Sequence, residues 1–184
     1  MQKNTYSRSF AVKGSATRRI CMISMMSALC TVLSFVSVTF GGIKITFESF
    51  PVLLGALMFG PLDGMIVGFI GTLLYQLLSY GITVTTLLWI LPYAAAGFAL
   101  GMYAKLRRYS MGQVEMISAV LVCEVLITVL NTAAFYLDSI VYDYYSFALI
   151  FGSVPFKLLL CVIKGVVFGT VLPRLVGTLA RRGI

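Results

Sequence analysis

The feature that most constrains this chain is a run from Gly64 to Ala104 that contains no Asp, Glu, Lys or Arg. A transmembrane helix needs about 20 apolar residues, so this run is long enough for two crossings joined by a tight turn. Overall, 60% of the residues are hydrophobic and 11% are charged, whereas a soluble domain has about 25% charged residues. The composition therefore excludes a soluble or disordered chain and predicts an integral membrane protein.

Turn and loop signals divide the apolar sequence into six segments, which predicts an all-α bundle of six transmembrane helices. The expected helices are Ile20–Phe40, a short one from about Ser49 to Phe59, Leu62–Tyr80, Thr85–Ala104, Val114–Tyr136 and Phe147–Leu172. The alternating residues from Ile43 to Phe47 indicate an extended loop. We read the first segment as a retained helix, because a signal-peptide core has only about 7–15 apolar residues.

The Lys and Arg residues predict how the bundle is oriented. With six helices, the basic start of the chain, the loop with Lys105, Arg107 and Arg108, and the basic end share one side, whereas the opposite loops carry only Lys44. Basic loops stay in the cytoplasm, so both termini are expected there. The predicted organisation is a cytoplasmic segment over 1–19, a transmembrane domain over 20–175 and a cytoplasmic tail over 176–184. Orientation in the lipid bilayer explains the net charge of +8 better than a nucleic-acid partner does.

The sequence offers no set of residues for catalysis. It has no His, its six acidic residues are scattered, and no glycine-rich phosphate loop is present. The four cysteines lie inside apolar stretches and form no CxxC pair, so we read them as small buried residues. We expect no enzyme, no metal site, no cofactor and no ability to hydrolyse ATP alone.

Polar and aromatic residues gather in the half of the bundle opposite the basic loops. Trp89 and Tyr93 are four residues apart and share a helix face, and Gln76 and Asn131 are amides within apolar helices. Aromatic residues near an interface are often only anchors. Buried amides, however, need hydrogen-bond partners, and several such groups on one side indicate a ligand pocket.

Three charged residues fall inside predicted helices. Glu124 and Lys164 lie at comparable depth, so the simplest interpretation is that they pair with each other; the alternative is a role in ligand binding or coupling. Lys157 lies about two turns from Lys164, toward the outer face. It is expected to point to a polar cavity or to the outer interface.

Small residues spaced four apart recur along the helices. Gly64 with Gly68, Gly97 with Gly101, and Gly165 with Gly169 allow helices to approach closely, which suggests packing inside the bundle. The pair Ser24 and Ala28 lies near the cytoplasmic end of the first helix, among Met residues, and is the best candidate for docking against a partner's helices.

The order of these motifs resembles that of a known transporter family. Residues 59–64, Phe-Gly-Pro-Leu-Asp-Gly, lead into 67–71, Val-Gly-Phe-Ile-Gly. Residues 44–51, Lys-Ile-Thr-Phe-Glu-Ser-Phe-Pro, the Leu130-Asn131-Thr132 segment and Ser24-x3-Ala28 complete the pattern. In these features, residues 18–175 resemble the substrate-binding S component of an energy-coupling factor (ECF) transporter, and the folate family fits best.

The resemblance implies a mechanism. Such a protein, in the plasma membrane of a prokaryote, captures a vitamin with high affinity from outside. It docks through Ser24 and Ala28 on a transmembrane coupling subunit that rests on two ATPase subunits. ATP hydrolysis then topples it in the membrane, and the vitamin is released inward.

For folate, the resemblance implies roles for particular side chains. Trp89 or Tyr93 would stack on the pterin, and Asn131, with Glu48 or Gln76, would bind its edge. Lys44 or Lys157 would meet the glutamate carboxylates, because a cation forms charge-assisted hydrogen bonds with them. The expected substrate-binding residues are Lys44, Phe47, Glu48, Gln76, Trp89, Tyr93, Asn131 and Lys157.

Two alternatives stay open on sequence alone. The first is the same family with another vitamin, such as pantothenate or hydroxymethylpyrimidine. The second is a small membrane enzyme or a stand-alone carrier, in which Glu124 and Lys164 would be the residues to suspect. The lack of His and of clustered acids argues against the enzyme, and the lack of visible inverted repeats argues against the carrier.

Overall fold

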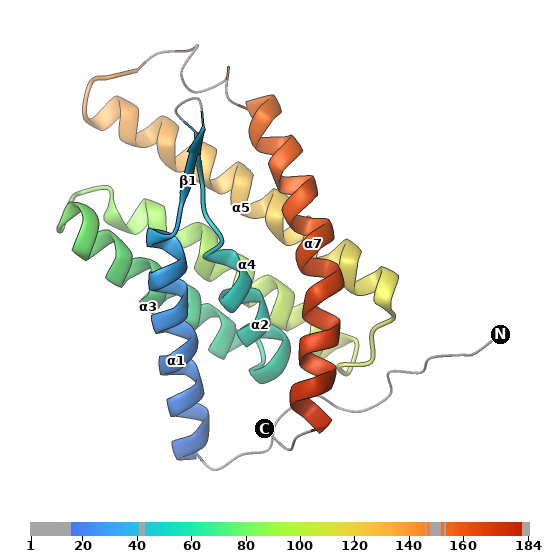
Figure 1. Cartoon of the computed structure of the whole chain (residues 1–184). Coiled ribbons are helices and arrows are strands. Elements are labelled where there is room, and N and C mark those ends of the chain that lie inside the picture. Colours follow the sequence, from blue (N-terminus) through green and yellow to red (C-terminus); the bar gives the residue numbers. More distant parts are fainter. Residues whose placement is uncertain (1–15, 41–42, 146, 148–151, 153, 182–184) are drawn as a thin grey trace.

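Six helices and one short hairpin make up the described part of the computed structural model, which covers residues 16–40, 43–145, 147, 152 and 154–181 (Figure 1). The helices are α1 (Ala16–Phe35), α2 (Ser49–Phe59), α3 (Pro61–Tyr80), α4 (Thr86–Leu106), α5 (Gln113–Val141) and α7 (Val154–Arg181). The strands are β1 (Val38–Phe40) and β2 (Ile43–Ile45). The predicted fold class, a helical membrane protein, is confirmed.

The largest departure from the sequence prediction is at the end of the first helix. We expected it to reach Phe40, but α1 ends at Phe35, and β1 pairs antiparallel with β2 in the register Val38 to Ile45. The residues 38–40 are Val, Thr and Phe, types that favour strands. The predicted extended segment is confirmed over Ile43–Ile45.

Two long helices also exceed their predicted limits. The fifth helix reaches Val141 instead of Tyr136, and the last continues through Pro173 to Arg181 instead of ending at Leu172. A short or amphipathic extension at a helix end carries little hydropathy signal, so a prediction based on apolar runs stops early.

The last helix was also predicted to start at Phe147, but α7 starts at Val154, after a turn at residue 152. Pro155 stands in its first turn, where a proline is tolerated because no backbone donor is needed. Residues 148–151 and 153 lie outside the described part.

Four of the described helices, α3, α4, α5 and α7, are long and apolar enough to cross a membrane. The apolar parts of α1 and α2 are shorter. With 11 residues, α2 is about 16 Å long, about half of the hydrocarbon thickness. The count of six spans and the cytoplasmic placement of the termini therefore stay predictions.

Close contacts between backbones hold the central helices together. A Cβ added at Gly64 on α3 would lie 2.9 Å from the carbonyl oxygen of Gly97 on α4, and one added at Gly169 on α7 would lie 2.8 Å from the Cα of Ile117 on α5. The glycine pairs thus pack inside the bundle, as predicted. The short α2 is buried along almost its whole length among these helices.

The two ends of the molecule differ in character (Figure 1). The hairpin lies at the same end as the close of α5 and the start of α7, and we call this the hairpin end. The start of α1, the connection from α4 to α5 and the close of α7 lie at the opposite end, which we call the basic end after Arg19, Arg107 and Arg174. There, Arg19 of α1 donates two hydrogen bonds of 2.7 Å to the buried carboxylate of Asp63 on α3.

Candidate ligand-binding site

A buried carboxylate stands at the centre of the candidate site. Glu48 precedes the first turn of α2, and Pro51 follows in that turn, where a helix needs no backbone donor. Glu48 is only 5% exposed, so its carboxylate needs hydrogen-bond donors. The hydroxyl of Thr46 donates to Oε1 over 2.8 Å, and the hydroxyls of Ser34 and Tyr93 also donate to the carboxylate.

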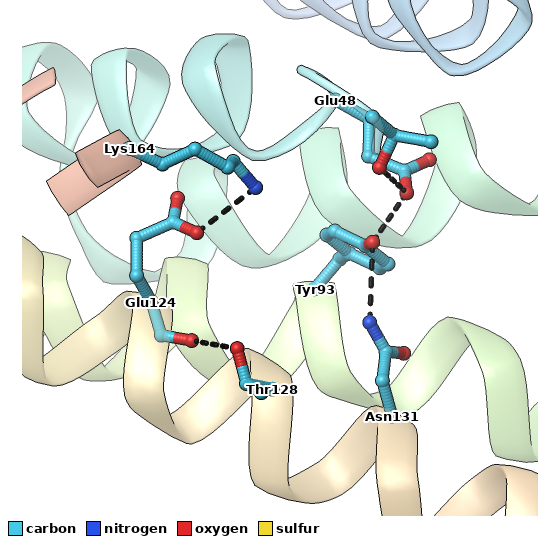
Figure 2. Close-up of polar contacts among 7 residues, drawn as sticks. Glu48, Tyr93, Glu124, Thr128, Asn131 and Lys164 are labelled. Carbon is cyan, nitrogen blue, oxygen red and sulfur yellow. Dashed lines mark hydrogen bonds and ion pairs between the residues drawn. The ribbon is translucent and has the colours of Figure 1, made fainter. Parts of the chain in front are cut away.

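This cluster continues across two more helices (Figure 2). The hydroxyl of Tyr93, on α4, donates to Glu48 and accepts a hydrogen bond of 3.3 Å from Nδ2 of Asn131 on α5. Three predicted site residues from distant parts of the chain therefore meet in one hydrogen-bonded group. We call Ser34, Thr46, Glu48, Tyr93 and Asn131 the Glu48 cluster.

A second group of side chains lies one to two turns further along α5, toward the hairpin end. The ring centroids of Trp89 and Phe135 are 6.3 Å apart, and the ammonium nitrogen of Lys157 lies 5.3 Å from the Phe135 centroid. Asp138 accepts a hydrogen bond of 3.5 Å from the Trp89 indole and another from the hydroxyl of Tyr144. Burial and this hydrogen bond raise the pKa of Tyr144 to about 12. We call these residues the Trp89 cluster.

The predicted pairing of Glu124 with Lys164 is present. The Lys164 ammonium lies 3.0 Å from Oε2 of Glu124, whose side chain is 1% exposed (Figure 2). Oε1 of Glu124 is buried and has no hydrogen-bond partner in the described part of the chain. The Lys164 ammonium nitrogen also lies 5.8 Å from the Phe168 centroid, so this group contacts both a carboxylate and an aromatic ring.

The remaining predicted residues lie around these clusters. Phe47 is 37% exposed, with its ring centroid 6.5 Å from that of Phe168. Gln76 is buried on α3, outside the hydrogen bonds of the Glu48 cluster. Lys44 belongs to β2, but its side chain lies outside the described part of the structure. Trp89 and Tyr93 share a helix face yet join two different clusters.

Ser34 and Thr46 are site residues that the sequence analysis missed. A lone Ser in an apolar helix is indistinguishable from a small packing residue, so Ser34 gave no signal. Thr46 stands two residues before Glu48 in an alternating segment, and that spacing places both side chains on one face of an extended chain. It was therefore a detectable partner of the carboxylate.

The two residues predicted for docking lie on an outward face of α1. Ser24 and Ala28 are both exposed, whereas Ser27, Cys30 and Thr31 on the opposite face are buried. α1 packs against α3 and α2. Within the described residues, no group of three or more His, Cys, Asp or Glu side chains could hold a metal ion.

Comparisons with known proteins place this arrangement in a family. A family model described as "ECF transporter, substrate-specific component" matches residues 18–172. No curated protein matches the sequence.

Several solved structures share the fold. The S component of a bacterial ECF transporter is 22% identical, with a TM-score of 0.63 over 91% of this chain and 98% of that one. The S component for biotin from an ECF-type ABC transporter is 15% identical, with a TM-score of 0.62 over 88% and 94%. FolT bound with folic acid is 20% identical, with a TM-score of 0.50 over 84% and 99%. At these identities the likeness establishes the fold and leaves the ligand open. Because the family model spans most of the sequence, the chain belongs to the substrate-specific components of ECF transporters, which are vitamin-binding membrane proteins and not enzymes.

Proposed function

We propose that this S component binds folate with high affinity from outside the cell and delivers it through an ATP-driven coupling module in the plasma membrane of a prokaryote. The observation that carries the proposal is the Glu48 cluster beside the Trp89 cluster. Together they offer a buried carboxylate, an amide, aromatic rings and a cation in sequence along one side of α5.

The Glu48 cluster suits the edge of a pterin. A carboxylate is an acceptor only and can take up to about four hydrogen bonds, so the three donors around Glu48 leave room for an N–H group of the ligand. Asn131 donates to Tyr93 through its nitrogen, which leaves its carbonyl oxygen to accept a second ligand N–H. Trp89, or Tyr93 as the alternative, supplies the ring against which a flat heterocycle stacks, and Gln76 and Phe47 are the further residues proposed to line the site.

The two lysines of α7 have different roles in this proposal. Lys164 is paired with Glu124, so a ligand carboxylate would have to compete with a buried carboxylate for it. Lys157 contacts a ring, and no ion pair engages it within the described residues. A glutamate carboxylate of folate therefore fits at Lys157, with Lys44 as the second proposed cation.

Binding of folic acid to the purified protein in detergent tests this proposal. The chain has one tryptophan, so its fluorescence reports on Trp89 alone, and calorimetry gives the affinity independently. We expect saturable binding of folic acid without partner subunits or ATP, and no competition by an excess of biotin, pantothenate or hydroxymethylpyrimidine. Binding of one of those vitamins in place of folic acid would overturn the folate assignment and keep the family.

The proposed partners are one transmembrane coupling subunit and two ATPase subunits, with α1 as the docking helix. The small side chains of Ser24 and Ala28 leave a shallow outward face on which another helix can pack closely. We expect Ser24→Trp and Ala28→Trp to keep folic acid binding and to abolish uptake in cells that also produce the coupling module.

The control places the same bulk elsewhere on the lipid-facing surface. Val122 on α5 is 65% exposed, so Val122→Trp adds an indole away from α1 and should leave both binding and uptake intact. Normal uptake by the α1 variants would contradict the assignment of this docking face.

A further inference from the structure

The buried face of α1 reaches into the candidate site. Cys30 and Ser34 are one turn apart, and both contact Glu48. The thiol of Cys30 donates to the Glu48 carbonyl oxygen over 3.4 Å, and the hydroxyl of Ser34 donates to Oε2 of the carboxylate. α1 therefore holds both the backbone and the side chain of the central residue of the site.

The hydrogen bonds continue from Glu48 to the other side of the bundle. Ser34 on α1 donates to Glu48, Glu48 accepts from Tyr93 on α4, and Tyr93 accepts from Asn131 on α5. Ser34, Glu48 and Tyr93 are each at most 6% exposed. Hydrogen bonds are stronger in such a low-dielectric interior, and members of a buried network depend on one another.

We infer that Ser34 is a positioning residue of the ligand site and that the chain Ser34–Glu48–Tyr93 couples the site to α1. The proposed docking residues Ser24 and Ala28 lie on the opposite face of the same helix. A ligand that engages the Glu48 carboxylate would thus restrain the helix that the coupling subunit meets. The hydrogen-bonded connection between the site and α1 does not depend on which ligand binds. Its consequence for uptake rests on the proposed function.

A neighbouring hydroxyl on α1 provides the control. Thr31, one turn before Phe35, donates 3.0 Å hydrogen bonds to the carbonyl oxygens of Ser27 and of Gly71 on α3. It is buried like Ser34, but these hydrogen bonds go to backbone carbonyl oxygens and not to the Glu48 carboxylate. Thr31→Val keeps the side-chain volume and removes a hydrogen bond between α1 and α3 that does not involve the Glu48 cluster.

The first experiment needs no ligand. Amide hydrogen exchange over residues 29–35 is measured for the wild type, Ser34→Ala, Tyr93→Phe and the double variant. Ser34→Ala removes a hydroxyl that donates both to Glu48 and, over 2.9 Å, to the carbonyl oxygen of Cys30. Tyr93→Phe removes the hydroxyl that joins Glu48 to Asn131. Each hydroxyl has one proton to donate, so each single change should speed exchange roughly 3- to 10-fold, the effect of about one lost donor. The double variant should exchange no faster than the faster single variant, because both changes break the same chain.

In the control pair, the effects of Thr31→Val and Tyr93→Phe should multiply. If the effects of Ser34→Ala and Tyr93→Phe also multiply, or if Tyr93→Phe leaves α1 exchange unchanged, the inference is wrong. Should Ser34→Ala prevent folding, Ser34→Cys replaces it, since a thiol of similar size donates more weakly.

The second experiment adds folic acid, with binding verified by calorimetry in the same samples. We expect folic acid to slow exchange of α1 several-fold in the wild type and in Thr31→Val. In Ser34→Ala this slowing should largely disappear while the affinity falls by less than tenfold. An undiminished slowing in Ser34→Ala would overturn the coupling. Failure of folic acid to bind would refute only the proposed substrate, because the exchange measurements without ligand test the connection between Ser34, Glu48 and Tyr93 separately.

Discussion

At the scale of single residues, the site depends on a buried carboxylate that accepts hydrogen bonds from three hydroxyl groups. Glu48→Gln keeps the size of the side chain but replaces one acceptor oxygen with an NH₂ group, which then faces a hydroxyl donor. A charge-assisted hydrogen bond contributes about 1.5–3 kcal/mol, so we expect folic acid affinity to fall roughly 10- to 100-fold by calorimetry. The control is Glu115→Gln, which removes a carboxylate paired with Arg107 at the basic end and should leave affinity unchanged.

The ion pair between Glu124 and Lys164 gives a second prediction at this scale. Lys164→Met leaves the Glu124 carboxylate buried without its cation, which typically costs about 3–5 kcal/mol. Adding Glu124→Gln removes that charge and should restore most of the lost stability in thermal unfolding. A double variant as unstable as Lys164→Met would show that the pair contributes by packing and not by charge.

At the scale of elements, the close contact between α3 and α4 carries the next prediction. A Cβ added at Gly68 would lie 2.7 Å from the carbonyl oxygen of Tyr93. Gly68→Ala must therefore push α4 away from α3, at a cost of about 1–3 kcal/mol, and it should lower the melting temperature. Gly112→Ser adds a Cβ where nothing lies within 4 Å and should leave the melting temperature nearly unchanged. Equal melting temperatures for the two variants would contradict the close packing.

The same scale shows how far sequence reasoning reaches. The turn between α2 and α3 was predictable, because Gly60 adopts a φ of 107° that a glycine tolerates and other residues do not, and Pro61 then starts a helix. The end of α1 was not predictable, because a short apolar run such as Val38–Phe40 fits a helix and a strand equally well by hydropathy.

The candidate site divides in the same way. Glu48 and Asn131 were visible as polar residues in apolar surroundings, where each demands a partner. Which partner each one takes depends on how distant helices meet. The hydrogen bond from Ser34 to Glu48 and the separation of Trp89 from Tyr93 into two clusters are therefore visible only in the three-dimensional structure.

At the scale of the whole molecule, orientation in the membrane decides whether the site faces the vitamin. The basic end carries Arg19, Arg107 and Arg174, whereas both proposed ligand clusters involve residues toward the hairpin end of α5. Since basic loops are retained in the cytoplasm, the site should open to the outside. Reversal of this orientation would turn a capture protein into one that binds ligand already in the cell.

Accessibility of single cysteines tests this orientation directly. Val84, in the turn between α3 and α4, is 86% exposed, and Ser110, between α4 and α5, is also exposed. In a chain whose four native cysteines are replaced by Ala, a membrane-impermeant maleimide should label Val84→Cys in intact cells and Ser110→Cys only after permeabilisation. A bundle with the reversed orientation would exchange these two results, so labelling of Ser110→Cys from outside would refute both the predicted topology and the outward-facing site.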